Sequence, residues 1–410
     1  MANMIDYLAW RGEFGFEVTP WNPVDALLMA NLSYLGFHSS SDGRGWTLSE
    51  AKRIDLVQEE KSAAFAERKR MFDAMAESNR FGGCRIHHYI ALTDPEAEMQ
   101  FSAVCADMPD GTMCVAFRGT DNTIVGWRED FNMAYQTIVP AQEAAVYYLA
   151  QAAEQTDRPL RLMGHSKGGN LAVYAAAGAT PEVRERIESI WAFDAPGMNV
   201  KMSQAEGYLL VKDKIRAYIP QSSVIGLLME YFQPYTVVHS NALGISQHDP
   251  FTWQVYGARF EEVESGVDHA AVVMKDTLHD WLENSTPEQR GGFVDVLFQY
   301  VESTKATRLS DLTNEKLRSL LVMVGNRKEV DPEARRAFNR LMAQAVTLGV
   351  GNVLERVRNR KEGTAEETKP AETDRIGEEK AEEAALEKDP GTEEQALPAA
   401  ESTENGENAE

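Results

Sequence analysis

The sequence predicts an α/β fold in which a central sheet is flanked by helices. Three apolar segments with the two-residue alternation typical of strands follow one another at 86–92, 99–107 and 112–119. Beyond them, strand-like segments alternate with helix-like segments, as in sheets whose parallel strands are joined by crossover helices. The chain has 410 residues, of which 43% are hydrophobic, so it is long enough to bury a large core.

The first 80 residues are expected to form a helical segment that packs on the core. Asn22 and Pro23 form a cap signal for a helix over 23–36, and a second helix is expected over 57–78. The alternation after the first three strands predicts a helix over 141–155, a strand over 160–164, a helix over 170–179, and strands over 189–195, 214–219, 235–240 and 251–256. Helical patterns return over 270–358.

The end of the chain differs in composition from the rest. Residues 361–410 carry 17 acidic and 5 basic side chains, and the segment from 359 onward has no Phe, Trp, Tyr or Val. Such a segment cannot bury enough apolar surface to offset the entropy of ordering it. We therefore divide the chain into an N-terminal helical segment over 1–80, a core over 81–285, a C-terminal helical region over 286–358 and a disordered acidic tail over 359–410.

Charge and cysteine content argue against several classes of protein. The formal net charge is −23, and an acidic surface repels phosphate backbones, so no nucleic-acid partner is expected. Cys84, Cys105 and Cys114 are too few for a disulfide framework and lack zinc-site spacing, which fits a reducing compartment. The sequence shows neither a targeting segment nor an apolar run of about 18 residues. We expect a soluble cytoplasmic protein with no membrane span, no metal and no cofactor, and nothing indicates a particular protein partner.

A nucleophile motif follows the predicted strand over 160–164. The letters GHSKGGN satisfy the pattern GxSxG with Gly164, Ser166 and Gly168, and they lead directly into an apolar helix. A sharp turn from strand to helix exposes the serine hydroxyl, and the two glycines are needed where a side chain would collide with neighbouring backbone. This context predicts a nucleophile elbow centred on Ser166.

Acyl transfer also needs two N–H donors that stabilise the oxyanion. Lys167, the residue after the serine, is expected to supply the first from its backbone. The strand over 112–119 ends in VAFRGT, with Trp127 and Asp130 a few residues further on. Together with GHSKGG, these motifs resemble the class 3 lipase group of α/β hydrolases. The resemblance implies an α/β-hydrolase sheet over the core and makes Thr120 the second oxyanion donor.

His248 is the expected catalytic base. It lies in GISQHDPFTWQV, which resembles the lipase pattern in which the catalytic histidine precedes a strand that carries a tryptophan. His239 and His269 are alternative bases, because they also follow the acid in the chain order of this fold. His165, inside the elbow, is expected to be a packing residue.

The acid departs from the class 3 pattern. That resemblance implies an aspartate after the strand over 214–219, but Ser222 and Ser223 stand there. We assign the acid to Asp194, at the end of the strand over 189–195, where pancreatic-type lipases carry theirs. The alternatives are that Asp194 only caps its own turn, or that another carboxylate meets the base, namely Asp213, Asp249 or Glu230.

The predicted function is a serine hydrolase, esterase-like or lipase-like, that cleaves a carboxylic ester or thioester of a small molecule or lipid through an acyl-enzyme. A lipid-active form needs an apolar mobile cover, for which 23–36 or 224–232 would serve. The alternative is a non-catalytic scaffold or interaction protein with a hydrolase fold. A third option is a peptidase or acyltransferase, because both can use the same triad. Residues 1–355 also resemble an uncharacterised bacterial family of lipase-like proteins.

Overall fold

The computed structural model describes residues 2–41, 43–57, 62–121, 123–133, 136–232, 234–286, 288–292 and 294. By its internal contacts the chain divides after Leu354, and all the described residues belong to the first unit. The helices expected beyond residue 294 and the acidic tail over 359–410 therefore lie outside the described residues.

An eight-stranded sheet whose strands lie in chain order forms the centre of the described unit. The first four strands pair antiparallel and the last five pair parallel, with β4 common to both sets. The strands are β1 (Trp46–Thr47), β2 (Arg85–Asp94), β3 (Met99–Asp107), β4 (Met113–Phe117), β5 (Leu160–His165), β6 (Ile187–Phe193), β7 (Ile215–Pro220) and β8 (Tyr235–Val238). The predicted α/β class, a sheet flanked by helices, is confirmed.

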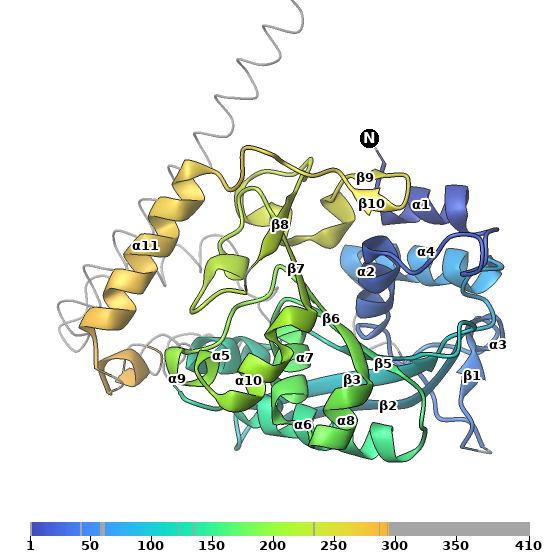
Figure 1. The fold of residues 1–410 in the computed structure, drawn as a ribbon, viewed down its shortest axis with the longest axis horizontal. Coiled ribbons are helices and arrows are strands. Elements are labelled where there is room, and N and C mark those ends of the chain that lie inside the picture. The colour runs from blue at the N-terminus through green and yellow to red at the C-terminus, as the bar shows by residue number, and fades with distance from the viewer. Residues whose placement is uncertain are drawn as a thin grey trace, which may run out of the picture. The chain divides into compact units, whose positions relative to one another are not determined.

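The crossover helices gather on one face of this sheet (Figure 1). Because β4 to β7 follow one another in order, connections of one hand return along the same face. They contain α5 (Ile124–Met133), α6 (Pro140–Glu154), α7 (Lys167–Gly178), α8 (Pro181–Arg186), α9 (Val200–Ser203) and α10 (Glu206–Val211). Alternate strand residues such as Val115, Leu162 and Ala192 pack against α6 and α7.

The N-terminal helices cover the opposite face, where alternate residues such as Ala116, Met163 and Phe193 meet them. These helices are α1 (Met4–Arg11), α2 (Pro23–Leu32), α3 (Leu48–Ala51) and α4 (Ala63–Glu77). The predicted cap is present, since the Asn22 side chain accepts from two N–H groups of α2. Every residue of α2 except Pro23 is buried. The idea that α2 is a mobile cover is therefore wrong, because its removal would expose the sheet.

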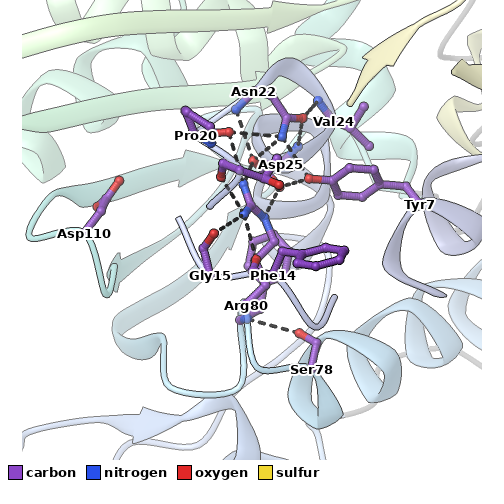
Figure 2. Close-up of polar contacts among 12 residues, drawn as sticks. Tyr7, Phe14, Gly15, Pro20, Asn22, Val24, Asp25, Ser78, Arg80 and Asp110 are labelled. Atoms are coloured by element: carbon purple, nitrogen blue, oxygen red, sulfur yellow. Dashed lines mark hydrogen bonds and ion pairs between the residues drawn. The ribbon is translucent and has the colours of Figure 1, made fainter. Parts of the chain in front are cut away.

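A buried ion pair holds the N-terminal segment together (Figure 2). The side chains of Arg80 and Asp25 are fully buried, and the Tyr7 hydroxyl donates to Asp25 Oδ1 at 2.7 Å. The Arg80 guanidinium also donates to the backbone carbonyls of Phe14, Gly15, Thr19 and Pro20. Because both charges are fully hydrogen-bonded, their desolvation is compensated, and the chain entering β2 is tied to the start of α2.

The strand expected over 251–256 is wrong. Pro250–Thr252 forms a short 3-10 helix, η4, directly after η3 (Gly244–His248). Only β9 (Val255–Tyr256) is extended, and it pairs with β10 (Arg259–Phe260) in a separate two-stranded sheet. The apolar side chains of Phe251 and Trp253 both enter the core, so their spacing reflects anchoring of a loop rather than strand alternation.

Three further elements of the described unit are η1 (Lys212–Lys214), η2 (Ile225–Leu227) and α11 (His269–Asn284). Thus 224–232 forms no long apolar helix. Among the described residues, every helix is too short or too polar to cross a membrane.

Candidate active site

Ser166 occupies a strained turn between β5 and α7. Its φ of 59° and ψ of −136° lie in a region that residues other than glycine rarely adopt. The backbone holds this conformation because the Ser166 N–H donates to the Phe193 carbonyl of the neighbouring strand at 2.9 Å. The Ser166 side chain is partly exposed, and among the described residues its hydroxyl has no hydrogen-bond partner.

The two glycines of the motif are required by close backbone approach. A Cβ added at Gly164 would lie 2.1 Å from the carbonyl carbon of Gly168, across the turn. A Cβ at Gly168 would lie 2.1 Å from the Phe117 oxygen, at the end of β4. Helix α7 therefore begins in contact with the ends of two strands, and only glycine fits at both positions.

His248 and Asp194 lie in direct contact. His248 Nδ1 is 2.6 Å from Asp194 Oδ2, and the Asp194 side chain is 1% exposed while that of His248 is 28% exposed. Asp194 follows β6 with a φ of 41°, and its N–H donates to the Tyr218 carbonyl of β7 at 2.7 Å. Across the described residues, His248 Nε2 makes no hydrogen bond.

The second oxygen of Asp194 is held by the segment after β7. The Ser223 hydroxyl donates to Asp194 Oδ1, and the Gly226 N–H donates to the same atom at 3.0 Å. Sequence reasoning missed both residues. The signal was the pair of serines at the position where the class 3 resemblance expects a carboxylate. Ser222, the neighbouring serine, donates to Asp268 instead.

The loop that carries His248 is anchored on both sides. The Trp253 indole donates to the Gln247 carbonyl at 2.8 Å, and Gln247 Oε1 accepts from the Ser222 N–H at 2.8 Å. His165 Nε2 lies 2.8 Å from the carbonyl oxygen of His248. The segment is therefore joined to the core, to the loop after β7 and to the elbow.

His165 is a buried structural histidine with a defined tautomer. A carbonyl only accepts hydrogen bonds, so Nε2 carries the proton, and Nδ1 accepts from the Tyr34 hydroxyl at 3.1 Å. Burial, followed by the charge of His248, lowers the pKa of His165 well below its usual value. His165 therefore stays neutral and links Tyr34 to the backbone of the His248 loop.

The alternative bases and acids lie in other contacts. His239 is paired with Glu261 at 3.4 Å, and His269 begins α11. Of the carboxylates, Asp213 lies in η1, Glu230 forms a strand bridge with Met198, and Asp249 accepts from the Phe251 N–H at 3.1 Å. None of these five residues hydrogen-bonds to His248.

The expected oxyanion residues lie on the two segments beside Ser166. Lys167 is the first residue of α7, so its N–H has no partner within the helix. Gly119, just before Thr120, comes so close to the elbow that an added Cβ would lie 3.0 Å from the Ser166 Cβ. The Thr120 hydroxyl donates to Asp130 Oδ2. Burial raises the pKa of Asp130 to about 6, although the nearby Lys167 charge lowers it.

The Lys167 side chain points away from the elbow into a buried ion pair. Its Nζ donates to Glu129 Oε2 at 2.8 Å and to the Gln100 carbonyl at 2.9 Å, and both charged side chains are at most 1% exposed. Glu129 also accepts from the backbone N–H groups of Gln100 and Ala141. Glu129, which sequence reasoning missed, thus joins β3, α5, α6 and α7.

No metal site is present among the residues that the structure describes, since they contain no group of three or more His, Cys, Asp or Glu able to hold an ion.

Comparison with known proteins identifies the family. The model of the Mbeg1-like family matches residues 75–299, more than half of the chain. The chain belongs to the Mbeg1-like family. No curated protein matches this Mbeg1-like chain. Its α/β-hydrolase fold follows from its own parallel strands and from the turn at Ser166.

Solved structures of lipases resemble this Mbeg1-like chain distantly. M37 lipase shares 16% identity, with 49% of this chain and 67% of the lipase covered and a TM-score of 0.32. The native propeptide complex of Rhizomucor miehei lipase shares 15% identity, with coverages of 46% and 71% and a TM-score of 0.29. A mutant of MDLA from Penicillium cyclopium shares 11% identity, with coverages of 59% and 84% and a TM-score of 0.33.

Proposed function

We propose that this chain is a serine hydrolase that cleaves a carboxylic ester or thioester through an acyl-enzyme. Ser166 is the nucleophile, His248 the general base and Asp194 the acid that orients it. The observation that carries the proposal is the 2.6 Å contact between His248 Nδ1 and Asp194 Oδ2, next to a serine held in a strained turn.

The chemistry follows from which ring nitrogen of His248 carries the proton. Asp194 accepts the Nδ1 proton, which leaves the lone pair on Nε2 to take the proton of the Ser166 hydroxyl. The serine oxygen then attacks the carbonyl carbon, and the N–H groups of Lys167 and Thr120 stabilise the oxyanion. The imidazolium returns its proton to the leaving alcohol or thiol, and water, activated by the same base, releases the acid.

Two further features support the proposal. The acid is held through both oxygens, so its orientation does not change when the imidazole becomes charged. Neither the Ser166 hydroxyl nor His248 Nε2 has a hydrogen-bond partner among the described residues, so a substrate can engage both. A small-molecule or lipid ester is the proposed substrate. A cytoplasmic location and the resemblance to a bacterial family of lipase-like proteins stay predictions from the sequence.

Covalent labelling with a fluorophosphonate tests the nucleophile directly. We expect one adduct per chain, on Ser166, and a loss of 4-nitrophenyl butyrate hydrolysis of at least about 10³-fold in Ser166→Ala. Ser246→Ala, an exposed serine in the His248 loop, is the matched control and should label normally. A folded wild-type chain that neither labels nor hydrolyses esters would favour the non-catalytic scaffold instead.

A further inference from the structure

We propose that Arg68 binds an anionic group, a carboxylate or a phosphate, on the substrate of this site. The proposal rests on the proposed hydrolase function and adds to it the class of ester: one that carries a negative charge near the scissile bond.

Among the described residues, Arg68 is a cation without a counter-ion. It projects from α4, and it makes no hydrogen bond or ion pair with any of the residues described. Its Nε atom is buried, and its guanidinium carbon lies 4.2 Å from the centre of the Tyr34 ring. The aromatic face stabilises the charge but accepts none of its five N–H donors. A guanidinium that is desolvated and stacked in this way gains most from a carboxylate or phosphate that binds two donors at once.

Tyr34 connects Arg68 to the reacting centre. The Tyr34 hydroxyl bonds to His165 Nδ1 at 3.1 Å, and a Cβ added at Gly119 would lie 2.3 Å from the same hydroxyl. The Gly119 position is also in contact with the Ser166 Cβ. The ring of Tyr34 therefore reaches from the guanidinium to the residues around the nucleophile, and an anion on Arg68 would lie about one aromatic side chain away from the scissile carbonyl.

The charged residues near Arg68 do not occupy its guanidinium, so an anion of the substrate can bind there. Arg118, the other cation close to Tyr34, is paired with Asp121 at 3.3 Å. Burial lowers the pKa of Arg68, and the nearby charges of Asp249 and Glu67 oppose that lowering. Neither carboxylate forms an ion pair with it. A substrate anion would therefore compete with two nearby carboxylates for one guanidinium, which makes Asp249 a useful second position to change.

The test compares charged and neutral esters of the same length in the full chain. One pair is the 4-nitrophenyl monoester of glutarate and 4-nitrophenyl valerate, which differ by a terminal carboxylate in place of a methyl group. The other pair is a lysophosphatidate and the corresponding monoacylglycerol. For each pair, the ratio of kcat/KM for the charged ester to that for the neutral ester is measured in wild type, Arg68→Gln, Arg68→Lys and Arg70→Gln.

We expect the ratio to fall at least about tenfold in Arg68→Gln for one or both pairs, because a charge-assisted contact is lost. The pair that responds identifies carboxylate or phosphate as the anion. Arg68→Lys should keep part of the ratio, since the charge remains without the planar fork. Arg70→Gln, an exposed arginine of the same helix, should leave it unchanged. Asp249→Asn should raise the ratio, because a competing carboxylate is removed.

A binding measurement separates this proposal from the hydrolase proposal. Glutarate and glycerol 3-phosphate are each added at millimolar concentration, and at least one of them should raise the Tm of wild type and of Ser166→Ala. That rise should disappear in Arg68→Gln. An unchanged ester ratio in Arg68→Gln, or equal Tm shifts with and without Arg68, overturns the anion site. Full turnover in Ser166→Ala overturns the hydrolase proposal while the Tm result still decides the role of Arg68.

Discussion

Asp194 holds the imidazole of His248 across 54 residues of sequence, with 2.6 Å between Oδ2 and Nδ1. The other carboxylate oxygen is occupied by the Ser223 hydroxyl and the Gly226 N–H. The carboxylate therefore joins the end of β6, the segment after β7 and the loop before η4 at one point. Because each residue contacts a different atom of this carboxylate or of the imidazole, single substitutions can test the role of each residue separately.

Replacement of Asp194 by asparagine should lower kcat strongly and KM little. An amide cannot stabilise the imidazolium and favours the wrong tautomer of His248, so we expect a loss of about 10⁴-fold in kcat. Steady-state kinetics on 4-nitrophenyl butyrate measures it. Asp213→Asn is the control and should retain the wild-type rate, since Asp213 lies in η1. A full rate in Asp194→Asn would remove Asp194 from the proposed triad.

The adjacent serines should respond differently to the same change. Ser223→Ala removes one hydrogen bond to the carboxylate of Asp194, so kcat should fall by roughly tenfold, the effect of losing one charged hydrogen bond. Ser222→Ala removes a bond to Asp268 instead and should leave kcat unchanged. Equal kcat values in the two variants would mean that Ser223 does not position the acid. The same ester assay measures both.

Loss of Glu129 should destabilise the fold more than loss of a partly exposed acid. Glu129→Ala leaves the buried Lys167 ammonium uncompensated, with an expected cost of about 3–5 kcal/mol in unfolding free energy. Asp73→Ala breaks the partly exposed Lys69–Asp73 pair on α4 and should cost less than about 1 kcal/mol. Urea denaturation followed by circular dichroism compares them. Similar midpoints for both variants would contradict the structural role of the buried pair.

The pH dependence of stability should report Asp130. Its pKa is raised from 3.8 to about 6, so the folded chain binds this proton more tightly than the unfolded chain. That contribution is present below about pH 4 and is lost as the pH rises through about 6. Asp130→Asn keeps the group neutral at every pH. The Tm of the variant minus that of wild type should therefore be larger at about pH 7 than at about pH 4.5. A difference that is constant with pH would show that Asp130 is not desolvated.

Local patterns in the sequence predicted the elements that depend on nearby residues. The segments 86–92 and 99–107 lie in β2 and β3, and 112–119 contains β4, because their apolar residues alternate between the two faces of the sheet. By contrast, α5 lies in a segment without a clear helical pattern, and Glu129 makes its contacts to β3 and α6 only in the folded chain. The strand prediction over 251–256 was wrong for a related reason: Trp253 is apolar because it anchors the loop in the core of the folded chain, and local alternation does not show this.

The sequence by itself determined the α/β class and the turn at Ser166, because strand alternation and the steric need for Gly164 and Gly168 act over a few residues. The tertiary structure alone decided which carboxylate contacts His248, where the Lys167 side chain goes and which groups surround Arg68. Those contacts join segments that come together only when β6, β7 and the helices pack around the sheet. The energy of such contacts depends on burial and on the full set of neighbours, which no short stretch of sequence contains.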